Sequence, residues 1–295
     1  MKLLRSYYLL CKPNVVYMML ICALVGMLLA EQTISSVSTI LIALIGIALC
    51  SGSAAAINQV IDRKADAAMT RTDQRPLPQG ELSALHASSF ALVIGVVGAL
   101  ILFLYINTLT MILTLASLVG YAFIYTVYLK RATPQNIVIG GAAGATPPLL
   151  GWTAMTGQID LIAVILFLII FTWTPPHFWA LALYRKEDYY AAKIPMLPVT
   201  HGEQYTRVHI TLYTLMLTIV SFLPFIIKFS SFFYLAGAVV LNLVFLYYVF
   251  RMQLAKNNFL ANKIFNYSIV YLSAIFGFLI ADRYLVLIMN IKDFL

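Results

Sequence analysis

Long hydrophobic runs without charge, separated by short polar segments, make up most of the chain. A bilayer core about 30 Å thick is crossed by a helix of about 20 apolar residues, so windows of that length are candidate spans. We predict an all-α polytopic membrane bundle of about nine transmembrane helices, forming a single domain over residues 1–295. The windows without Asp, Glu, Lys or Arg are 14–30, 38–57, 86–105, 109–128, 136–155, 161–181, 209–227, 231–250 and 264–281.

Composition supports a membrane protein and indicates its orientation. Hydrophobic residues make up 62% of the chain and charged residues 10%, and the mean hydropathy is +0.92, beyond the range of soluble domains. With the N-terminus in the cytoplasm, sixteen of the nineteen Lys and Arg residues fall on the cytoplasmic side, as the positive-inside rule predicts. The lipid bilayer is therefore the expected partner, and the net charge of +8 gives no reason to expect nucleic acid.

Two long polar segments, about 58–85 and 182–208, are predicted as cytoplasmic loops. They are either solvated connectors or parts of a site, and they hold seven of the eleven acidic residues. A secondary transporter would place its acids near the middle of the membrane. Because these acids lie at the cytoplasmic face of the membrane, their position favours an enzyme over a transporter.

The first polar segment contains a regularly spaced set of oxygen ligands. Asn58, Asp62 and Asp66 are each four residues apart, which places them on one face of a helix. Magnesium takes one or two carboxylates and leaves its other positions to water and phosphate oxygens. Downstream, Arg71 and Arg75 offer the forked donors that suit phosphate. The set predicts a metal and diphosphate site, while the alternative is a helix end entering water with weak ion pairs.

The order of these residues resembles a known family. The motif Asn-x-x-x-Asp-x-x-x-Asp is followed by Met69-Thr70-Arg71-Thr72 and Arg75-Pro76-Leu77. This pattern is similar to the first motif of the UbiA superfamily of intramembrane prenyltransferases, and within it to the protoheme IX farnesyltransferases. Further stretches that resemble the family are Lys12-Pro13, residues 136–145 with Pro147-Pro148, and residues 177–182.

The resemblance implies a UbiA-type fold and a specific reaction. Such an enzyme of the bacterial inner membrane transfers farnesyl from farnesyl diphosphate to a vinyl group of protoheme IX (heme b), giving heme O. Mg²⁺ assists the loss of diphosphate, with Asp62, Asp66 and Asp188 expected as catalytic metal ligands on the cytoplasmic side. Heme A synthase or heme-copper oxidase assembly are the implied partners. The alternative acceptor is an aromatic quinone precursor.

The second polar segment departs from the family pattern. Tyr184 stands four residues before Asp188 and Ala192 four residues after it, so one aspartate occupies the place of the usual Asp-x-x-x-Asp. Arg185 and Lys193 are expected to contact diphosphate by charge and position. For Lys193, a lysine that anchors the chain at the membrane interface is the alternative.

His177 is an ionisable residue in an otherwise uncharged window, and such residues are functional candidates. We expect it to ligate or hydrogen-bond the heme, or to move a proton. The alternative is a structural histidine bonded to a backbone carbonyl freed by Pro175 or Pro176.

Two further patterns concern packing. Tyr121, Tyr125 and Tyr128 follow helical spacing and predict an aromatic stripe, either packing or substrate-facing. Gly140 and Gly144, with the glycine between them, predict close helix approach.

Overall fold

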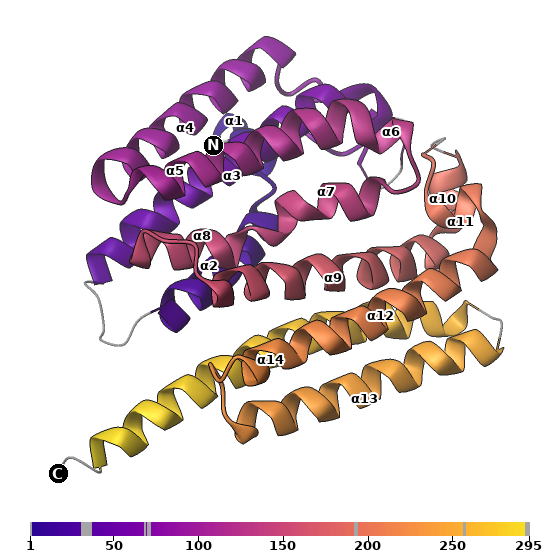
Figure 1. Cartoon of the computed structure of the whole chain (residues 1–295). Helices are drawn as coiled ribbons and strands as arrows, with labels where there is room; N and C mark the ends of the chain where they lie inside the picture. Colours follow the sequence, from indigo (N-terminus) through magenta and orange to yellow (C-terminus); the bar gives the residue numbers. More distant parts are fainter. Residues whose placement is uncertain are drawn as a thin grey trace. The chain divides into compact units, whose positions relative to one another are not determined.

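The computed structural model describes residues 2–30, 37–67, 69, 72–191, 194–255 and 258–292, with residues 2, 131 and 286–292 described by their backbone alone. It divides into two compact units, Met1–Ile159 with Ala191–Lys193, and Asp160–Tyr190 with Ile194–Leu295 (Figure 1). The secondary structure of the described residues is helical throughout, so the predicted all-α class is confirmed.

Among its described residues, the first unit contains nine helical segments, one of them a π-helix. A short helix, α1 (Lys2–Leu10), precedes α2 (Pro13–Ala30), α3 (Val37–Ala67) and α4 (Ala84–Tyr105). The next long helix changes from α-helical to π-helical hydrogen bonding along its length. Its first part is α5 (Thr108–Val119), which continues directly into the π-helix η1 (Gly120–Leu129). The unit ends with α6 (Lys130–Ala132), α7 (Asn136–Ala145) and α8 (Pro147–Thr156).

The second unit is built on four long helices. They are α9 (Leu161–Tyr184), α12 (Gly202–Ile226), α13 (Phe232–Ala255) and α14 (Phe259–Lys292), with the short α10 (Lys186–Ala191) and α11 (Leu197–Thr200) between the first two. Both α9 and α13 pack against α12 and α14 (Figure 1). The four helices therefore form a bundle in which each has two neighbours.

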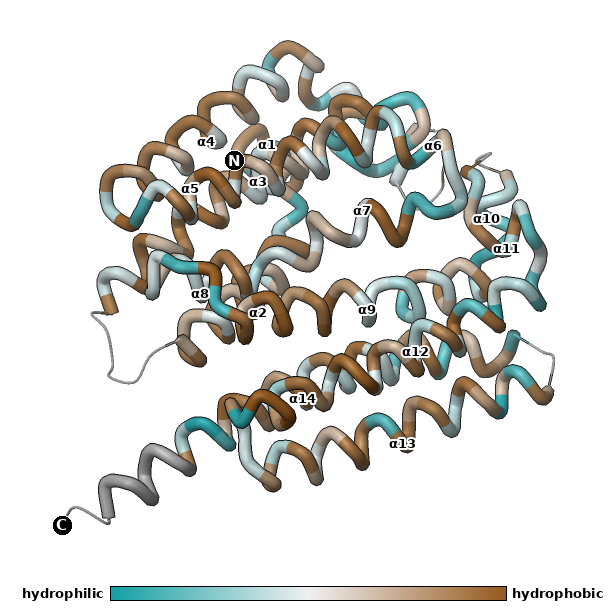
Figure 2. The backbone as a smooth tube through the Cα atoms, viewed as in Figure 1, coloured by the Kyte–Doolittle hydropathy of each residue, from teal (hydrophilic) through white to brown (hydrophobic). Residues whose placement is uncertain are grey.

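Eight helices among the described residues are long and apolar enough to cross a membrane. Figure 2 shows their lengths as largely hydrophobic, with hydrophilic residues gathered near α6 and near α10 and α11. The predicted window 136–155 is the exception, because it forms two ten-residue helices, α7 and α8, rather than one.

Proline chemistry explains this break. Pro147 lacks an N–H, which leaves the carbonyl of Ala143 without its helical donor. Two hydroxyls replace that donor, Ser117 Oγ at 3.1 Å and Thr146 Oγ1 at 2.9 Å. Membrane helices tolerate breaks where neighbouring Ser and Thr side chains satisfy the freed backbone groups.

The broken pair nevertheless runs the length of the neighbouring crossing formed by α5 and η1. At one end, Asn136 Nδ2 donates to the carbonyl of Lys130 at 3.3 Å. At the other end, Asn107 Nδ2, at the start of α5, donates to the carbonyl of Thr153 at 2.9 Å. Counted together with the eight long helices of the described residues, the pair α7–α8 agrees with the predicted number of about nine.

Both predicted polar segments are partly helical. In the first, α3 continues to Ala67, as the helical spacing of Asn58, Asp62 and Asp66 predicts. Much of 182–208 is helical, with α10, α11 and the start of α12 inside it. A charged residue ends the bilayer crossing but not the backbone hydrogen bonding, so the helices extend beyond the apolar windows.

Small residues set the helix spacing in the first unit. A Cβ added to Gly151 of α8 would lie 1.8 Å from the carbonyl oxygen of Ala23 in α2, so only glycine allows this approach. A Cβ on Gly140 would lie 2.1 Å from the ring of Tyr125, whereas one on Gly144 would have no neighbour within 4 Å. Close approach is thus confirmed for Gly140 and wrong for Gly144.

A buried acid in the second unit has a structural partner set. Asp282 of α14 accepts hydrogen bonds from the backbone N–H groups of Ser231 (2.8 Å) and Tyr234 (3.2 Å) and from the Ser231 hydroxyl. These donors lie at the start of α13, where backbone N–H groups lack helical partners. Asp282 therefore caps the N-terminus of α13 from a neighbouring helix.

Candidate functional site

Asn58, Asp62 and Asp66 form a column of polar side chains on one buried face of α3. Asp62 is 1% exposed and Asn58 and Asp66 are each 4% exposed. Asn58 Nδ2 donates to Asp62 Oδ2 at 3.0 Å, one helical turn away. Two carboxylates in so dry a place need compensating charge.

Three cations from three other segments supply that charge. Lys130 Nζ lies 2.6 Å from Asp62 Oδ2, and an Arg75 guanidinium nitrogen lies 2.6 Å from Asp66 Oδ2. Lys12, between α1 and α2, donates from Nζ to the Asn58 side-chain oxygen. From the sequence, Lys12 belongs to the Lys12-Pro13 pair that resembles the family, and Lys130 is one of the basic residues on the predicted cytoplasmic side. The predicted position of both lysines on that side was the available signal for a shared site.

The π-helix η1 brings the Thr126 hydroxyl into contact with α3. Its hydrogen bonds join residues five apart, as in the bond from the Lys130 N–H to the carbonyl of Tyr125. Thr126 Oγ1 donates to the carbonyl of Tyr121 at 2.8 Å and accepts from Asn58 Nδ2 at 3.0 Å. In this register Tyr121 and Tyr125 stack at 5.6 Å.

The same register breaks the predicted tyrosine stripe. Tyr128 is 69% exposed and does not share the stacked face. The stripe assumed α-helical spacing, and a π-helix changes the angle between successive residues.

Lys12 is held by its backbone as well as by Asn58. Its φ is +51°, a left-handed conformation uncommon for a non-glycine residue. Gln59 Nε2 fixes the end of α1 by donating to the carbonyls of Leu9 (3.1 Å) and Leu10 (2.9 Å). Burial lowers the pKa of Lys12 to about 7, and Arg75 and Lys130 act in the same direction against Asp66 and Asp62. Lys12 thus combines an uncommon backbone conformation with repulsion from Arg75 and Lys130. An anion bound beside it would offset that repulsion.

A small polar pocket of about 190 Å³ opens beside these groups. Within the described part of the chain, the Oε1 atom of Gln59 is buried without a hydrogen-bond partner. With Lys12 and Arg75 in its wall, the pocket suits an anion. Magnesium prefers oxygen ligands and keeps several of its waters, so the groups at this site that fit a hydrated divalent cation are the carboxylates of Asp62 and Asp66 beside the Asn58 amide. The pocket is lined by Leu9, Lys12, Gln59, Gln74, Arg75 and Pro76.

The predicted second acidic site has a different character. The side chain of Asp188 is 58% exposed and pairs with Arg185 at 4.0 Å, a surface contact of small energetic value. The described residues contain no cluster of three or more His, Cys, Asp or Glu side chains. Arg71 and Lys193, both predicted as diphosphate contacts, lie outside the described residues.

His177 is 8% exposed on α9 of the second unit. Its Nδ1 lies 2.7 Å from Ser268 Oγ of α14. The ring is stacked between Trp173 at 4.3 Å and Phe265 at 4.6 Å. The Nδ1 contact is thus a hydroxyl on another helix, not a carbonyl freed by the prolines of α9.

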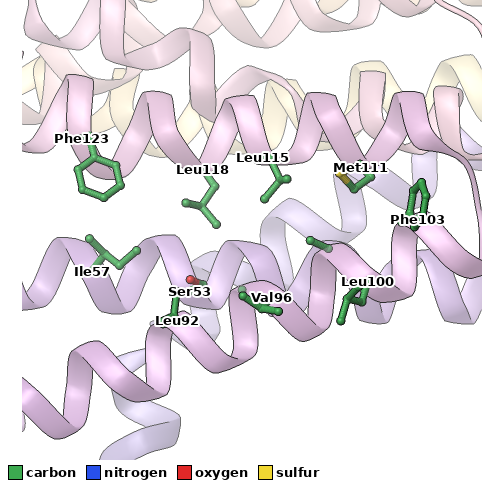
Figure 3. Close-up of a pocket in the computed structure, with 12 residues that line it drawn as sticks. Ser53, Ile57, Leu92, Val96, Leu100, Phe103, Met111, Leu115, Leu118 and Phe123 are labelled. Atoms are coloured by element: carbon green, nitrogen blue, oxygen red, sulfur yellow. The ribbon is translucent and has the colours of Figure 1, made fainter.

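The first unit also contains an apolar groove of about 490 Å³ between α3, α4 and the helix pair α5–η1 (Figure 3). Ile57 and Phe123 line one end, and Leu100 and Phe103 line the other. The Ser53 hydroxyl in its wall already donates to the carbonyl of Ala91 at 2.7 Å. The groove offers space for a hydrocarbon chain and no cation for a phosphate.

Comparison with protein families gives one match over most of the chain, the UbiA prenyltransferase family, at residues 19–276. The chain belongs to this family. The UbiA resemblance inferred from the motifs is therefore confirmed. Because eight helices in the described part of the chain are long and apolar enough to cross a membrane, the protein is a multi-pass membrane protein.

Individual proteins and solved structures within the family are also similar to this chain. A protein of Pseudoalteromonas atlantica named protoheme IX farnesyltransferase 2 is 55% identical over 95% of this chain and 92% of its own length. Among solved structures, one described for digeranylgeranylglyceryl phosphate synthase has a TM-score of 0.83 at 20% identity, covering 96% of this chain and 99% of that one. A UbiA homolog from Archaeoglobus fulgidus, bound to GPP and Mg²⁺, has a TM-score of 0.62 at 15% identity over 93% and 99%. These solved structures support the UbiA fold.

Proposed function

We propose that this protein transfers the farnesyl group of farnesyl diphosphate to a vinyl group of protoheme IX, giving heme O. The observation that carries the proposal is the buried pair Asp62 and Asp66 surrounded by Lys12, Arg75 and Lys130. The identity of 55% to a protein named protoheme IX farnesyltransferase 2 supports the choice of heme as acceptor over a quinone precursor.

The charges of this cluster suit a prenyl diphosphate bound together with Mg²⁺. Arg75 and Lys130 balance the two carboxylates, and Lys12, whose pKa is about 7 in the cluster, adds one further positive charge when an anion beside it holds its proton. A prenyl diphosphate carries about three negative charges near neutral pH, and Mg²⁺ carries two positive ones, so together they add one negative charge. The filled site is then close to neutral, which avoids leaving an uncompensated charge in a buried place.

Each residue has a proposed role in that site. Asp62 and Asp66 hold the magnesium ion, and Asn58 is a further oxygen donor beside them. When bound, the ion neutralises charge on the diphosphate as it leaves. Lys12, Arg75 and Lys130 bind the diphosphate oxygens. Preorganised donors of this kind stabilise the charge that develops as the bond breaks.

The reaction begins at the allylic carbon of farnesyl diphosphate. Its bond to oxygen breaks and the electron pair leaves with the diphosphate. The outer carbon of the heme vinyl group attacks the allylic cation, and water adds to the remaining carbon with loss of a proton. The product carries a hydroxyethylfarnesyl chain, and the cations of the first unit retain the diphosphate during the transfer.

The second polar segment and Arg71 keep their predicted roles as part of this proposal. Asp188 is proposed to hold a second metal ion without a partner aspartate, and Arg185, Lys193 and Arg71 to contact diphosphate. His177 is proposed to contact the heme. The exposure of Asp188 and Arg185 leaves both accessible to a charged substrate.

The proposed setting is the bacterial inner membrane with the N-terminus and the site on the cytoplasmic side. The excess of basic residues at that side supports the orientation. We propose that the two units act as a single domain, since the family match runs through both. Heme A synthase or heme-copper oxidase assembly are the proposed destinations of the product.

The decisive experiment incubates purified protein with farnesyl diphosphate, Mg²⁺ and heme b and separates the hemes by chromatography. We expect a more hydrophobic heme and metal-dependent release of diphosphate, both lost in Asp62→Ala and Asp66→Ala. Prenylation of a quinone-ring precursor in the absence of any heme product would reject the proposed acceptor. Retention of wild-type rates by either variant would reject the metal assignment.

A further inference from the structure

The hydrogen bonds around His177 determine which ring nitrogen carries the proton. Ser268 has one hydroxyl proton and two close polar neighbours, His177 Nδ1 at 2.7 Å and the backbone carbonyl of Phe265 at 2.6 Å. A carbonyl oxygen can only accept, so the Ser268 hydroxyl donates to Phe265. His177 must then donate from Nδ1 to the Ser268 oxygen. This tautomer leaves the lone pair of Nε2 without a proton.

The orientation of the ring is fixed as firmly as its tautomer. Trp173 and Phe265 stack on it at interplanar angles of 21° and 29°, and Phe178 meets it edge-on at 87°. Trp173 is itself anchored, because its Nε1 donates to the Ser268 carbonyl at 2.7 Å. One residue, Ser268, thus holds both rings.

Metal-ligating histidines share this arrangement. Histidines that bind metals donate the second ring N–H to an oxygen acceptor, which fixes the tautomer and directs the free nitrogen.

We propose that His177 Nε2 is an axial ligand of the heme iron, with Ser268 as the residue that positions it. The inference rests on the proposed function, because it takes heme b as the substrate. The iron accepts the Nε2 lone pair in a coordinate bond, and no atom is transferred. His177 thereby holds the acceptor, while the chemistry takes place at the vinyl group.

The test is spectroscopic and needs no turnover. Purified protein is titrated with ferric heme b without farnesyl diphosphate, and binding is followed by the Soret band and by electron paramagnetic resonance. In wild-type protein labelled with ¹⁵N-histidine, we expect a hyperfine coupling from one iron-bound imidazole nitrogen. Absence of that coupling at saturating heme would overturn the proposal without recourse to any variant.

Variants then assign the nitrogen to His177. We expect His177→Ala to lose the coupling, to bind heme at least about 10-fold more weakly, and to regain an imidazole spectrum when free imidazole is added. Ser268→Ala should keep the coupling but weaken heme binding by about 10-fold, the usual scale for losing the partner of a metal-bound histidine. His201→Ala is the matched control, since His201 is exposed in the same unit, and it should leave the spectrum unchanged.

Two outcomes separate this inference from the proposed function. If wild-type protein farnesylates heme b but His177→Ala retains the histidine spectrum, the axial ligand assignment is wrong and the transferase function stands. If the coupling is present but no farnesylated heme forms with Mg²⁺ and farnesyl diphosphate, the function fails and heme binding remains. Diphosphate affinity, measured in each variant, shows whether the first unit is still folded.

Discussion

At the scale of single residues, buried acids of this protein fall into two kinds that burial alone does not separate. Asp62 and Asp282 are both at most 2% exposed. Asp282 accepts from backbone N–H groups at a helix start, whereas Asp62 faces the ammonium group of Lys130. A backbone partner stays in place through a reaction, but a flexible lysine can exchange one anion for another. The partner therefore distinguishes a structural acid from a site acid.

The first prediction concerns Lys130. Lys130→Gln should lower kcat/KM for farnesyl diphosphate by about 100-fold, because removing one preorganised donor to a developing negative charge typically costs 10²–10³. Steady-state assays with heme b measure the effect. Lys64→Gln is the control, since Lys64 is an exposed lysine of α3 beside the column, and its rate should stay at the wild-type value. A Lys130→Gln enzyme that is less stable but equally active would make Lys130 a counter-ion only.

The second prediction concerns Asp282. Asp282→Ala should lower the free energy of unfolding by about 1–2 kcal/mol, the scale for losing a helix cap, and leave kcat unchanged in the folded fraction. Denaturant titration in mixed micelles and an activity assay on the same sample measure both quantities. Asp62→Ala provides the opposite case, with turnover lost. A large fall in kcat for Asp282→Ala at normal stability would show that partner type does not separate the two kinds of acid.

At the scale of helices, the sequence identifies the crossings well and their internal irregularities poorly. The spacing of Asn58, Asp62 and Asp66 places them on one face because a regular α-helix has one period. The same reasoning wrongly places Tyr128 on the stripe of Tyr121 and Tyr125, because the spacing of tyrosines in a sequence does not indicate π-helical hydrogen bonding. It also fails for Lys12 and Lys130, because contacts between segments far apart in the chain depend on packing. Lysine at a membrane edge satisfies the positive-inside rule equally well with or without a partner.

The third prediction tests the packing of α2 against α8. Gly151→Ala should destabilise the protein by about 1–3 kcal/mol, the usual cost of overpacking, because the added carbon would lie 1.8 Å from a backbone oxygen. Gly144→Ala is the matched control on α7 with open space at its Cβ position. It should be neutral or stabilising by up to about 1 kcal/mol through helix propensity. Equal stability of the two variants, measured by denaturant titration, would contradict the close approach of the helices.

At the scale of the whole molecule, the broken pair α7–α8 determines which side of the membrane every later segment occupies. Eight continuous helices alone would return the chain to its starting side, whereas a ninth crossing places the C-terminus opposite the N-terminus. The contacts of Asn136 and Thr153 at the two ends of the α5–η1 crossing favour nine. Residues 157–159, directly after α8, are exposed, so the side of the membrane from which they can be labelled distinguishes eight crossings from nine.

The fourth prediction follows from this geometry. In a protein whose three cysteines are replaced, Lys64→Cys should react with a membrane-impermeant maleimide only from the cytoplasmic face. Gln158→Cys should react only from the opposite face, because α7 and α8 together cross the bilayer. Intact cells and inverted membrane vesicles provide the two faces, and the cysteine-free protein provides the background. Labelling of both positions from the same face would mean that α7 and α8 enter and leave on one side, which would invert the orientation of every helix from α9 onward.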